Sequence, residues 1–285
     1  MSNDLLFPQF LLNRGVLDAA EVRGFLKKML HSKVDVPVQA LFHGVATAAE
    51  LTSLGTLSGA AFRESAEKEG ILTASQLYNL GEALSGEGCL FAQALLDAGR
   101  LDYGEIERLF RGFMRAGEHP LAEAVERAAG GALAEELPLY TEYVGVAMLA
   151  FKRFMKIACV IDPQAEPFAA SVPRCVVSQA VTGGVSIVAG LEMPDDVFLE
   201  LARRYSHEDF SVPDALALDS IAEFLNVLDG FFAVRLGERS LELDLEIPKT
   251  ACALNPKASP SKFLRLHLDS PVGAFALILA ADEFL

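Results

Sequence analysis

The feature that most constrains this chain is a short pattern that occurs four times in its first 116 residues. The four segments read "LLNRGVLDAAEV", "LFHGVATAAEL", "SAEKEGILTASQL" and "LLDAGRLDYGEI". Their glycines are Gly15, Gly44, Gly70 and Gly99, which are 29, 26 and 29 residues apart, so the units recur in pairs with a period of 55. Self-similarity at a fixed spacing is typical of arrays of short helices.

Each unit combines the end of one helix with the start of the next. The glycine suits a left-handed C-terminal cap, and an Asp or Thr follows three residues later with a Glu or Gln three residues beyond it. These capping boxes are Asp18/Glu21, Thr47/Glu50, Thr73/Gln76 and Asp102/Glu105. An N-cap of this kind contributes about 1 kcal/mol to helix stability. The apolar residue between glycine and cap is expected to pack inward, which concerns Leu17, Ala46, Leu72 and Leu101. We therefore predict an all-α docking domain over residues 1–116.

The sequence pattern changes from about residue 117, and we interpret residues 117–134 as a linker or helical connection. Residues 135–285 mix helical and strand-like stretches and are predicted to form an α+β domain, an antiparallel sheet covered by helices. Helices are expected over 139–155, 194–205 and 218–235, and strands over 174–181, 185–193, 241–248, 262–268 and 273–282. The "TGG" between the first two strands predicts a tight hairpin.

Composition and charge exclude several classes of function. The net charge of −15 argues against binding to a nucleic-acid backbone, which requires clustered Lys and Arg. The longest apolar runs, "VGVAMLAF" and "AFALILAA", are much shorter than the ~20 residues of a membrane-spanning helix. No membrane insertion is expected, and because "MSNDLLFPQF" lacks a signal-peptide pattern, the expected location is cytoplasmic.

Cysteines and histidines are scattered along the chain. The cysteines form no CxxC pair, so all four are expected to be buried, reduced thiols: Cys89, Cys159, Cys175 and Cys252. No metal site is expected from the five isolated histidines, which are His31, His43, His119, His207 and His267.

The stretch "LDSIAEFLNVLDG", residues 218–230, has two contrasting faces. Its apolar stripe is Leu218, Ile221, Phe224, Leu225 and Leu228, and the opposite side carries Asp219, Glu223, Asn226 and Gly230. The pattern alone fits a solvated polar face. However, Asn is a mediocre helix former, and an interior glycine costs about 1 kcal/mol relative to Ala. We therefore expect this face to meet another protein.

These residues resemble the active-site helix of the CheC/CheX/FliY chemotaxis phosphatases, whose pattern is [DS]-x3-E-x2-N followed by a proline. Asp219, Glu223 and Asn226 fit the three positions, and Gly230 matches a glycine usual in the family. The proline would be Pro248, with 21 intervening residues, one fewer than usual. The order of elements over 135–285 is also similar to CheX, with one motif copy, and implies a CheX-like α/β sandwich.

The resemblance implies a reaction and a partner. The substrate would be the aspartyl phosphate of a CheY-like receiver domain, with Asn226 and Glu223 as catalytic residues. Asn226 would hold the attacking water, and Glu223 would pair with a basic group of the receiver. Asp219, Glu223, Gly230 and Pro248 would bind the partner. This chain would need no cofactor, since the receiver would hold the Mg²⁺. The resemblance also suggests a homodimer.

Two alternatives remain open at the level of sequence. Residues 8–113 resemble the helical modules that precede the ATPase core of type II secretion and pilus assembly ATPases, but "GEALSGEGCL" lacks the GK[ST] of a nucleotide-binding loop. The partner of this module is unknown. The chain could therefore be a non-catalytic adaptor or scaffold that binds a receiver or a secretion or pilus component. A weaker alternative is an ATPase-associated assembly subunit.

Overall fold

The computed structural model describes residues 6–55, 57, 59–82, 86–117, 119–131, 133–169, 171–252 and 263–285. The chain divides into two compact units, Met1–Pro120 and Leu121–Leu285, and each is described by itself. The stretch 117–134 contains the helix α9, His119–Ala129.

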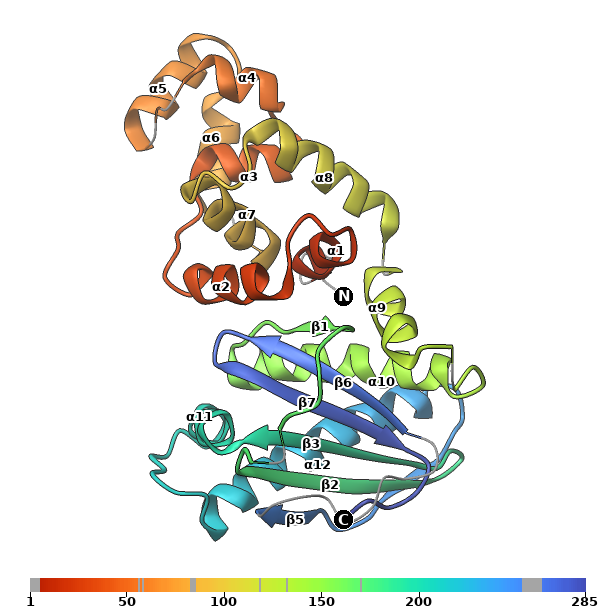
Figure 1. Ribbon diagram of the computed structural model, residues 1–285. Coiled ribbons are helices and arrows are strands. Elements are labelled where there is room, and N and C mark those ends of the chain that lie inside the picture. Colours follow the sequence, from red (N-terminus) through yellow and green to blue (C-terminus); the bar gives the residue numbers. More distant parts are fainter. Residues whose placement is uncertain are drawn as a thin grey trace. The chain divides into compact units, whose positions relative to one another are not determined.

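The described residues of the first unit fold into short helices (Figure 1). The predicted caps are confirmed: the four glycines have φ between 61° and 71°, and each capping box forms its backbone hydrogen bonds. The four apolar residues between glycine and cap are all buried, as predicted. The helices are α1 (Phe7–Asn13), α2 (Ala19–Met29), α3 (Val36–Phe42), α4 (Ala48–Ser53), α5 (Gly59–Lys68), α6 (Ala74–Glu82), α7 (Glu87–Asp97) and α8 (Tyr103–Ala116).

An aromatic cluster forms part of the core of the first unit. The Phe7 ring on α1 lies edge-on to Phe42 of α3 and to Phe113 of α8, with centroids 5.7 and 5.5 Å apart. Edge-to-face packing of this kind contributes beyond the burial of area alone. Helices distant in sequence are thereby joined through one side chain.

The second unit is built on an antiparallel sheet. Its strand order is β1-β6-β7-β3-β2-β4, and β5 also pairs with β2. The strands are β1 (Val160–Asp162), β2 (Arg174–Gly183), β3 (Ile187–Pro194), β4 (Leu243–Leu245), β5 (Lys249–Cys252), β6 (Phe263–Ser270) and β7 (Gly273–Ala280). The β2–β3 and β6–β7 pairs are the antiparallel neighbours expected from the sequence. Together with the helical first unit, this confirms the α+β class.

Helices pack on this sheet. Figure 1 shows α10 (Leu137–Ala150) and α12 (Ala215–Gly237) on one side of it. A short π-helix, Phe151–Met155, continues α10, and α11 (Asp195–Ser206) follows β3 directly. Glu142 of α10 pairs with Arg235 of α12 at 2.7 Å, which links the two helices beside their apolar contacts. In the described part of the chain, no helix is both long and apolar enough to cross a membrane, and this includes the 23-residue α12.

The observed strands differ from the predicted ones in three places: two strands were not predicted, and one is shorter than predicted. The short strands β1 and β5 were not predicted, and the strand expected over 241–248 is reduced to β4, Leu243–Leu245. Segments of three or four residues carry too little alternation to be recognised. Their strand geometry comes from pairing with β6 and β2, which lie far away in sequence.

The prediction of four reduced thiols is wrong for two of them. Cys175 on β2 lies opposite Cys252 on β5, and the two form a disulfide across 77 residues of sequence. The pairing depends on the register of β5 against β2, which no spacing in the sequence reveals. Cys89 is buried and Cys159 is half-buried.

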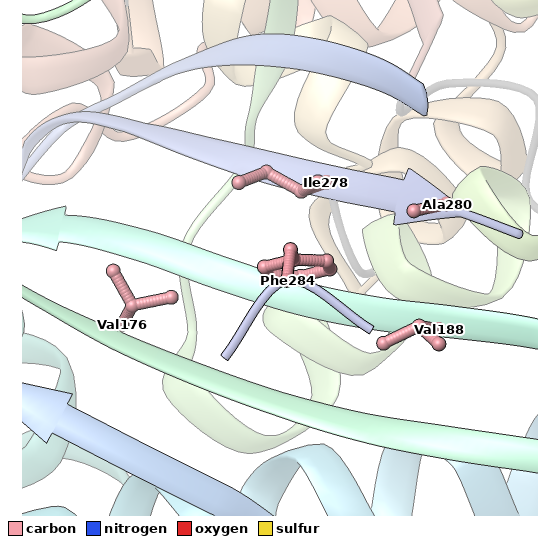
Figure 2. Packing of buried hydrophobic residues seen from close by; sticks show 5 residues of the cluster. All are labelled: Val176, Val188, Ile278, Ala280 and Phe284. Atoms are coloured by element: carbon pink, nitrogen blue, oxygen red, sulfur yellow. The ribbon is translucent and has the colours of Figure 1, made fainter. Parts of the chain in front are cut away.

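A second apolar cluster covers part of the sheet. Figure 2 shows the Phe284 ring near Val188 and Ile278, with Val176 and Ala280 completing the cluster. Gly190 on β3 permits this packing, because a Cβ there would lie 2.5 Å from the ring of Phe284. Phe284 therefore forms part of the core.

Candidate functional site

Helix α12 carries the candidate site. Asp214 caps its N-terminus by accepting a hydrogen bond from the backbone N–H of Ala217 at 2.9 Å. Leu218, expected in the apolar stripe, is only half-buried, whereas Ala217 is fully buried. The stripe thus begins one residue earlier than expected, since Ala217 is one turn before Ile221. Its remaining predicted members are fully buried: Ile221, Phe224, Leu225 and Leu228.

The motif residues lie along the other side of α12. Asp219 and Glu223 are exposed, and Asn226 and Gly230 are half-buried. Their spacing of four, three and four residues aligns them on one side of a helix. A Cβ added at Gly230 would meet nothing within 4 Å, so local packing does not require glycine there. The surface of α12 is therefore open at Gly230.

The carboxamide of Asn226 is held by a residue that the sequence analysis did not select. Gln179 on β2 is only 1% exposed. Its Nε2 donates to Asn226 Oδ1 at 2.9 Å and to the backbone oxygen of Glu246 at 2.6 Å. Glu246 lies two residues before Pro248, which is half-buried between β4 and β5. One amide therefore joins α12, β2 and the segment that contains the motif proline.

This network determines which way the Asn226 amide faces. A backbone carbonyl only accepts hydrogen bonds, so the Gln179 atom that faces Glu246 must be the nitrogen. The same nitrogen donates to Asn226, whose facing atom must be the oxygen. Nδ2 of Asn226 is left without a hydrogen-bond partner among the residues that the structure describes. The site thus offers a fixed amide with available N–H groups.

Gln179 leaves a signal in the sequence. Successive residues of a strand point to opposite faces, so Cys175, Val177, Gln179 and Val181 share the face of β2 that meets the helices. All four are buried, and Gln179 is the polar member of the set. A lone carboxamide at an inward strand position is a recognisable sign of a buried polar contact, but its partner depends on the tertiary structure.

Glu223 has a phenol beside it. Burial raises the pKa of Tyr205, at the end of α11, and the negative charge of Glu223 raises that pKa further. The Tyr205 ring packs against Phe224, with centroids 5.5 Å apart. The exposed carboxylate is therefore flanked by an aromatic side chain anchored in the core.

A buried acid lies on the inner side of the same helix. Asp229 is fully buried, and its Oδ1 accepts a hydrogen bond from the Tyr143 hydroxyl of α10 at 2.5 Å. Its Oδ2 has no hydrogen-bond partner within the described ranges. Burial raises the pKa of Asp229 to about 7, although the bond from Tyr143 acts in the opposite direction. Asp229 therefore titrates near neutral pH, three residues from Asn226.

Beyond Gly230 the exposed side of α12 becomes apolar. A hollow of about 270 Å³ lies between α12 and the α10 region, with Phe154, Phe231 and Val234 in its lining. Phe154 and Phe231 stack with centroids 5.9 Å apart, and the Arg153 guanidinium lies within 5.7 Å of both. Polar and apolar surfaces thus adjoin on one helix.

The described ranges contain no group of three or more His, Cys, Asp or Glu residues placed to hold a metal ion. The motif acids Asp219 and Glu223 are accordingly placed as single surface carboxylates one helical turn apart, not as a cluster.

Comparison with known proteins gives matches at the level of structure. No family model and no curated protein sequence matches the chain. The structure of chemotaxis protein CheX from Vibrio vulnificus is 12% identical and covers 49% of this chain and 93% of its own, with a TM-score of 0.42. CheX from Desulfovibrio desulfuricans is 10% identical, with coverages of 51% and 99% and a TM-score of 0.43. A CheX–CheY–BeF3–Mg²⁺ complex from Borrelia burgdorferi is 14% identical, with coverages of 50% and 97% and a TM-score of 0.42.

Proposed function

We propose that the second unit hydrolyses the aspartyl phosphate of a CheY-like receiver domain. The observation that carries the proposal is that two suitable side chains lie close together on α12. A carboxamide with available N–H groups, Asn226, lies one helical turn from an exposed carboxylate, Glu223. The motif resemblance supplies the reaction, and the arrangement of these two residues is compatible with it.

The chemistry requires positioning more than covalent work. The water oxygen forms a bond to phosphorus while the bond to the aspartyl oxygen breaks, and the aspartate leaves as a carboxylate with the electron pair. The water proton passes to the phosphate product. Charge in such a transition state is spread over the phosphoryl oxygens, where the Mg²⁺ of the receiver would stabilise it. Asn226 would hold the water in line, and because a carboxamide has no useful pKa, it would not act as a base.

The other motif residues would form the docking surface. Glu223 would pair with a basic residue of the receiver, an exposed interaction that contributes up to about 1 kcal/mol and fixes register more than affinity. Asp219 adds a second negative charge one turn earlier. The open space at Gly230 would admit close approach of the partner backbone. Pro248 would line the edge of this surface, next to the segment that Gln179 holds.

The first unit would recruit a further partner, whose identity the proposal leaves open. A chain that bound the receiver without hydrolysing its phosphate would be an adaptor instead. The two functions differ in one measurable respect, since only the enzyme accelerates the loss of phosphate.

The decisive experiment measures phosphate release from phosphorylated receivers with the purified full-length chain. The wild-type protein should accelerate release, and Asn226→Ala should abolish the acceleration while the protein stays folded and still binds the receiver. Ser220→Ala is the matched control, because among the described residues the Ser220 hydroxyl bonds only the backbone oxygen of Leu216 on the same helix. Full activity in Asn226→Ala would disprove the mechanism. Binding without acceleration by the wild-type protein would establish the adaptor.

A further inference from the structure

We propose that Gln179 is a positioning residue that orients the Asn226 carboxamide for its partner. The catalytic consequence of this inference rests on the proposed function. The orientation itself does not, because it can be measured in the protein alone.

The first argument is the saturation of the Gln179 amino group. Its two hydrogens serve two acceptors, Asn226 Oδ1 at 2.9 Å and the Glu246 carbonyl at 2.6 Å. Turning the Gln179 amide over would place its oxygen against the Glu246 oxygen, and two acceptors repel each other. The Glu246 backbone, which is held in the chain between β4 and β5, therefore fixes the orientation of Gln179. Gln179 in turn fixes the orientation of Asn226.

The second argument is energetic. Gln179 Oε1 is buried, and the structure shows no hydrogen-bond partner for it in the described part of the chain. A buried polar atom without a partner costs about 1–3 kcal/mol. A Met or Leu at this inward position would avoid the cost and would fit among its apolar neighbours. The presence of Gln179 is thus explained by what its amino group holds.

The third argument concerns the freedom of Asn226. The last torsion of an Asn side chain is broad and nearly two-fold, so an exposed amide samples both faces. A single hydrogen bond worth about 1 kcal/mol favours one face roughly fivefold. The opposite face would direct the Asn226 N–H groups at the Gln179 amino group, and this donor–donor contact increases the preference. Nδ2 is therefore directed away from Gln179, with its hydrogens available.

The consequence for the proposed reaction is a specific division of roles. The Nδ2–H of Asn226 would donate to the oxygen of the attacking water. The lone pair of Oδ1 that Gln179 leaves unused would accept a hydrogen of the same water. An amide already oriented in the free protein avoids the entropic cost of ordering it in the transition state.

The same residue connects two parts of the proposed docking surface. Its second acceptor, the Glu246 carbonyl, precedes Pro248 by two residues. The Cys175–Cys252 disulfide fastens β5, immediately after this segment, to the strand that carries Gln179. Asn226 and the segment that contains Pro248 are thus both held in place by contacts to one strand, β2.

The test compares Gln179→Met, which keeps the length of the side chain, with Ser178→Ala, the adjacent position of β2 whose side chain points to the other face. Side-chain amide ¹⁵N relaxation by NMR reports the order of the Asn226 amide without any receiver. We expect an ordered Asn226 amide in wild type and Ser178→Ala, and a mobile one in Gln179→Met. In phosphate-release kinetics, Gln179→Met should lower kcat by ~10- to 100-fold and leave receiver affinity within about twofold.

A double-variant comparison separates positioning from a general structural role. If Gln179 acts through Asn226, then Gln179→Met should have no further effect on the residual rate of Asn226→Ala. Equal loss of rate and affinity that persists in the Asn226→Ala background would overturn the proposal. A mobile Asn226 amide in the wild-type protein would overturn it too, even if Gln179→Met failed to fold. If wild type released no phosphate from any receiver, the proposed function would fail, and the NMR result alone would decide the positioning role.

Discussion

Replacement of Gly230 by Ala should have opposite effects on the stability of the fold and on the affinity for a receiver. Gly230 lies inside α12 without a positive φ, and an added Cβ would meet nothing within 4 Å. The substitution therefore creates no clash and gains the difference in helix propensity, about 1 kcal/mol. In a unit of this size that gain corresponds to a rise in melting temperature of about 2–4 °C.

The same methyl group would intrude on the docking surface. We expect Gly230→Ala to be more stable than wild type and to bind a receiver that carries a phosphoryl analogue less tightly. Calorimetric melting and titration calorimetry measure the two effects. Gly237→Ala is the matched control, because it lies at the last position of α12 with equally open surroundings. It should leave receiver affinity unchanged.

Two results would refute this reasoning. A lower melting temperature for Gly230→Ala would mean that the glycine serves the fold. A higher melting temperature with unchanged affinity would remove Gly230 from the interface.

Three further predictions concern charge and covalent structure. Native Asp229 keeps its proton up to about pH 7, whereas the unfolded carboxyl loses it near pH 4, so the free energy of unfolding should fall as pH rises between these values. Asp229→Asn should remove that decline, which urea denaturation at pH 5 and pH 8 would detect. Glu223→Gln should weaken receiver binding up to about fivefold and reduce its salt dependence, with binding measured at two ionic strengths. Reduction of the Cys175–Cys252 disulfide should lower the free energy of unfolding by about 2–4 kcal/mol, whereas a Cys175→Ser/Cys252→Ser variant should not respond to reductant.

The parts of the structure that sequence patterns predicted are those made by nearby residues. Asp18 and Glu21 form their capping box across three positions, and the hairpin of β2 and β3 closes through adjacent residues. The long helix α12 follows from its apolar stripe, although Ala217 and not Leu218 begins the buried side. In each case the pattern that identifies the element is formed by residues close together in the chain, even where packing against distant segments stabilises it.

Only part of the candidate site could be predicted from residues close together in the sequence. The alignment of Glu223 and Asn226 follows from the period of a helix, and their catalytic roles stay a prediction. The contact of Asn226 with Gln179 spans 47 residues, and the bond from Gln179 to Glu246 spans 67. Neither contact can be predicted from local sequence patterns, because both depend on how α12 and the β4–β5 segment pack against β2.

The sequence by itself thus determined where the four capping boxes of the first unit start their helices, which helix carries the motif, and which side of that helix is polar. The tertiary structure decided that Cys175 meets Cys252, that Asp229 is buried beside Tyr143, and that Asn226 is held by Gln179. The physical reason is the range of the interactions. Capping and helix periodicity act between neighbours along the chain, whereas strand register and buried hydrogen bonds exist only once distant segments have packed together.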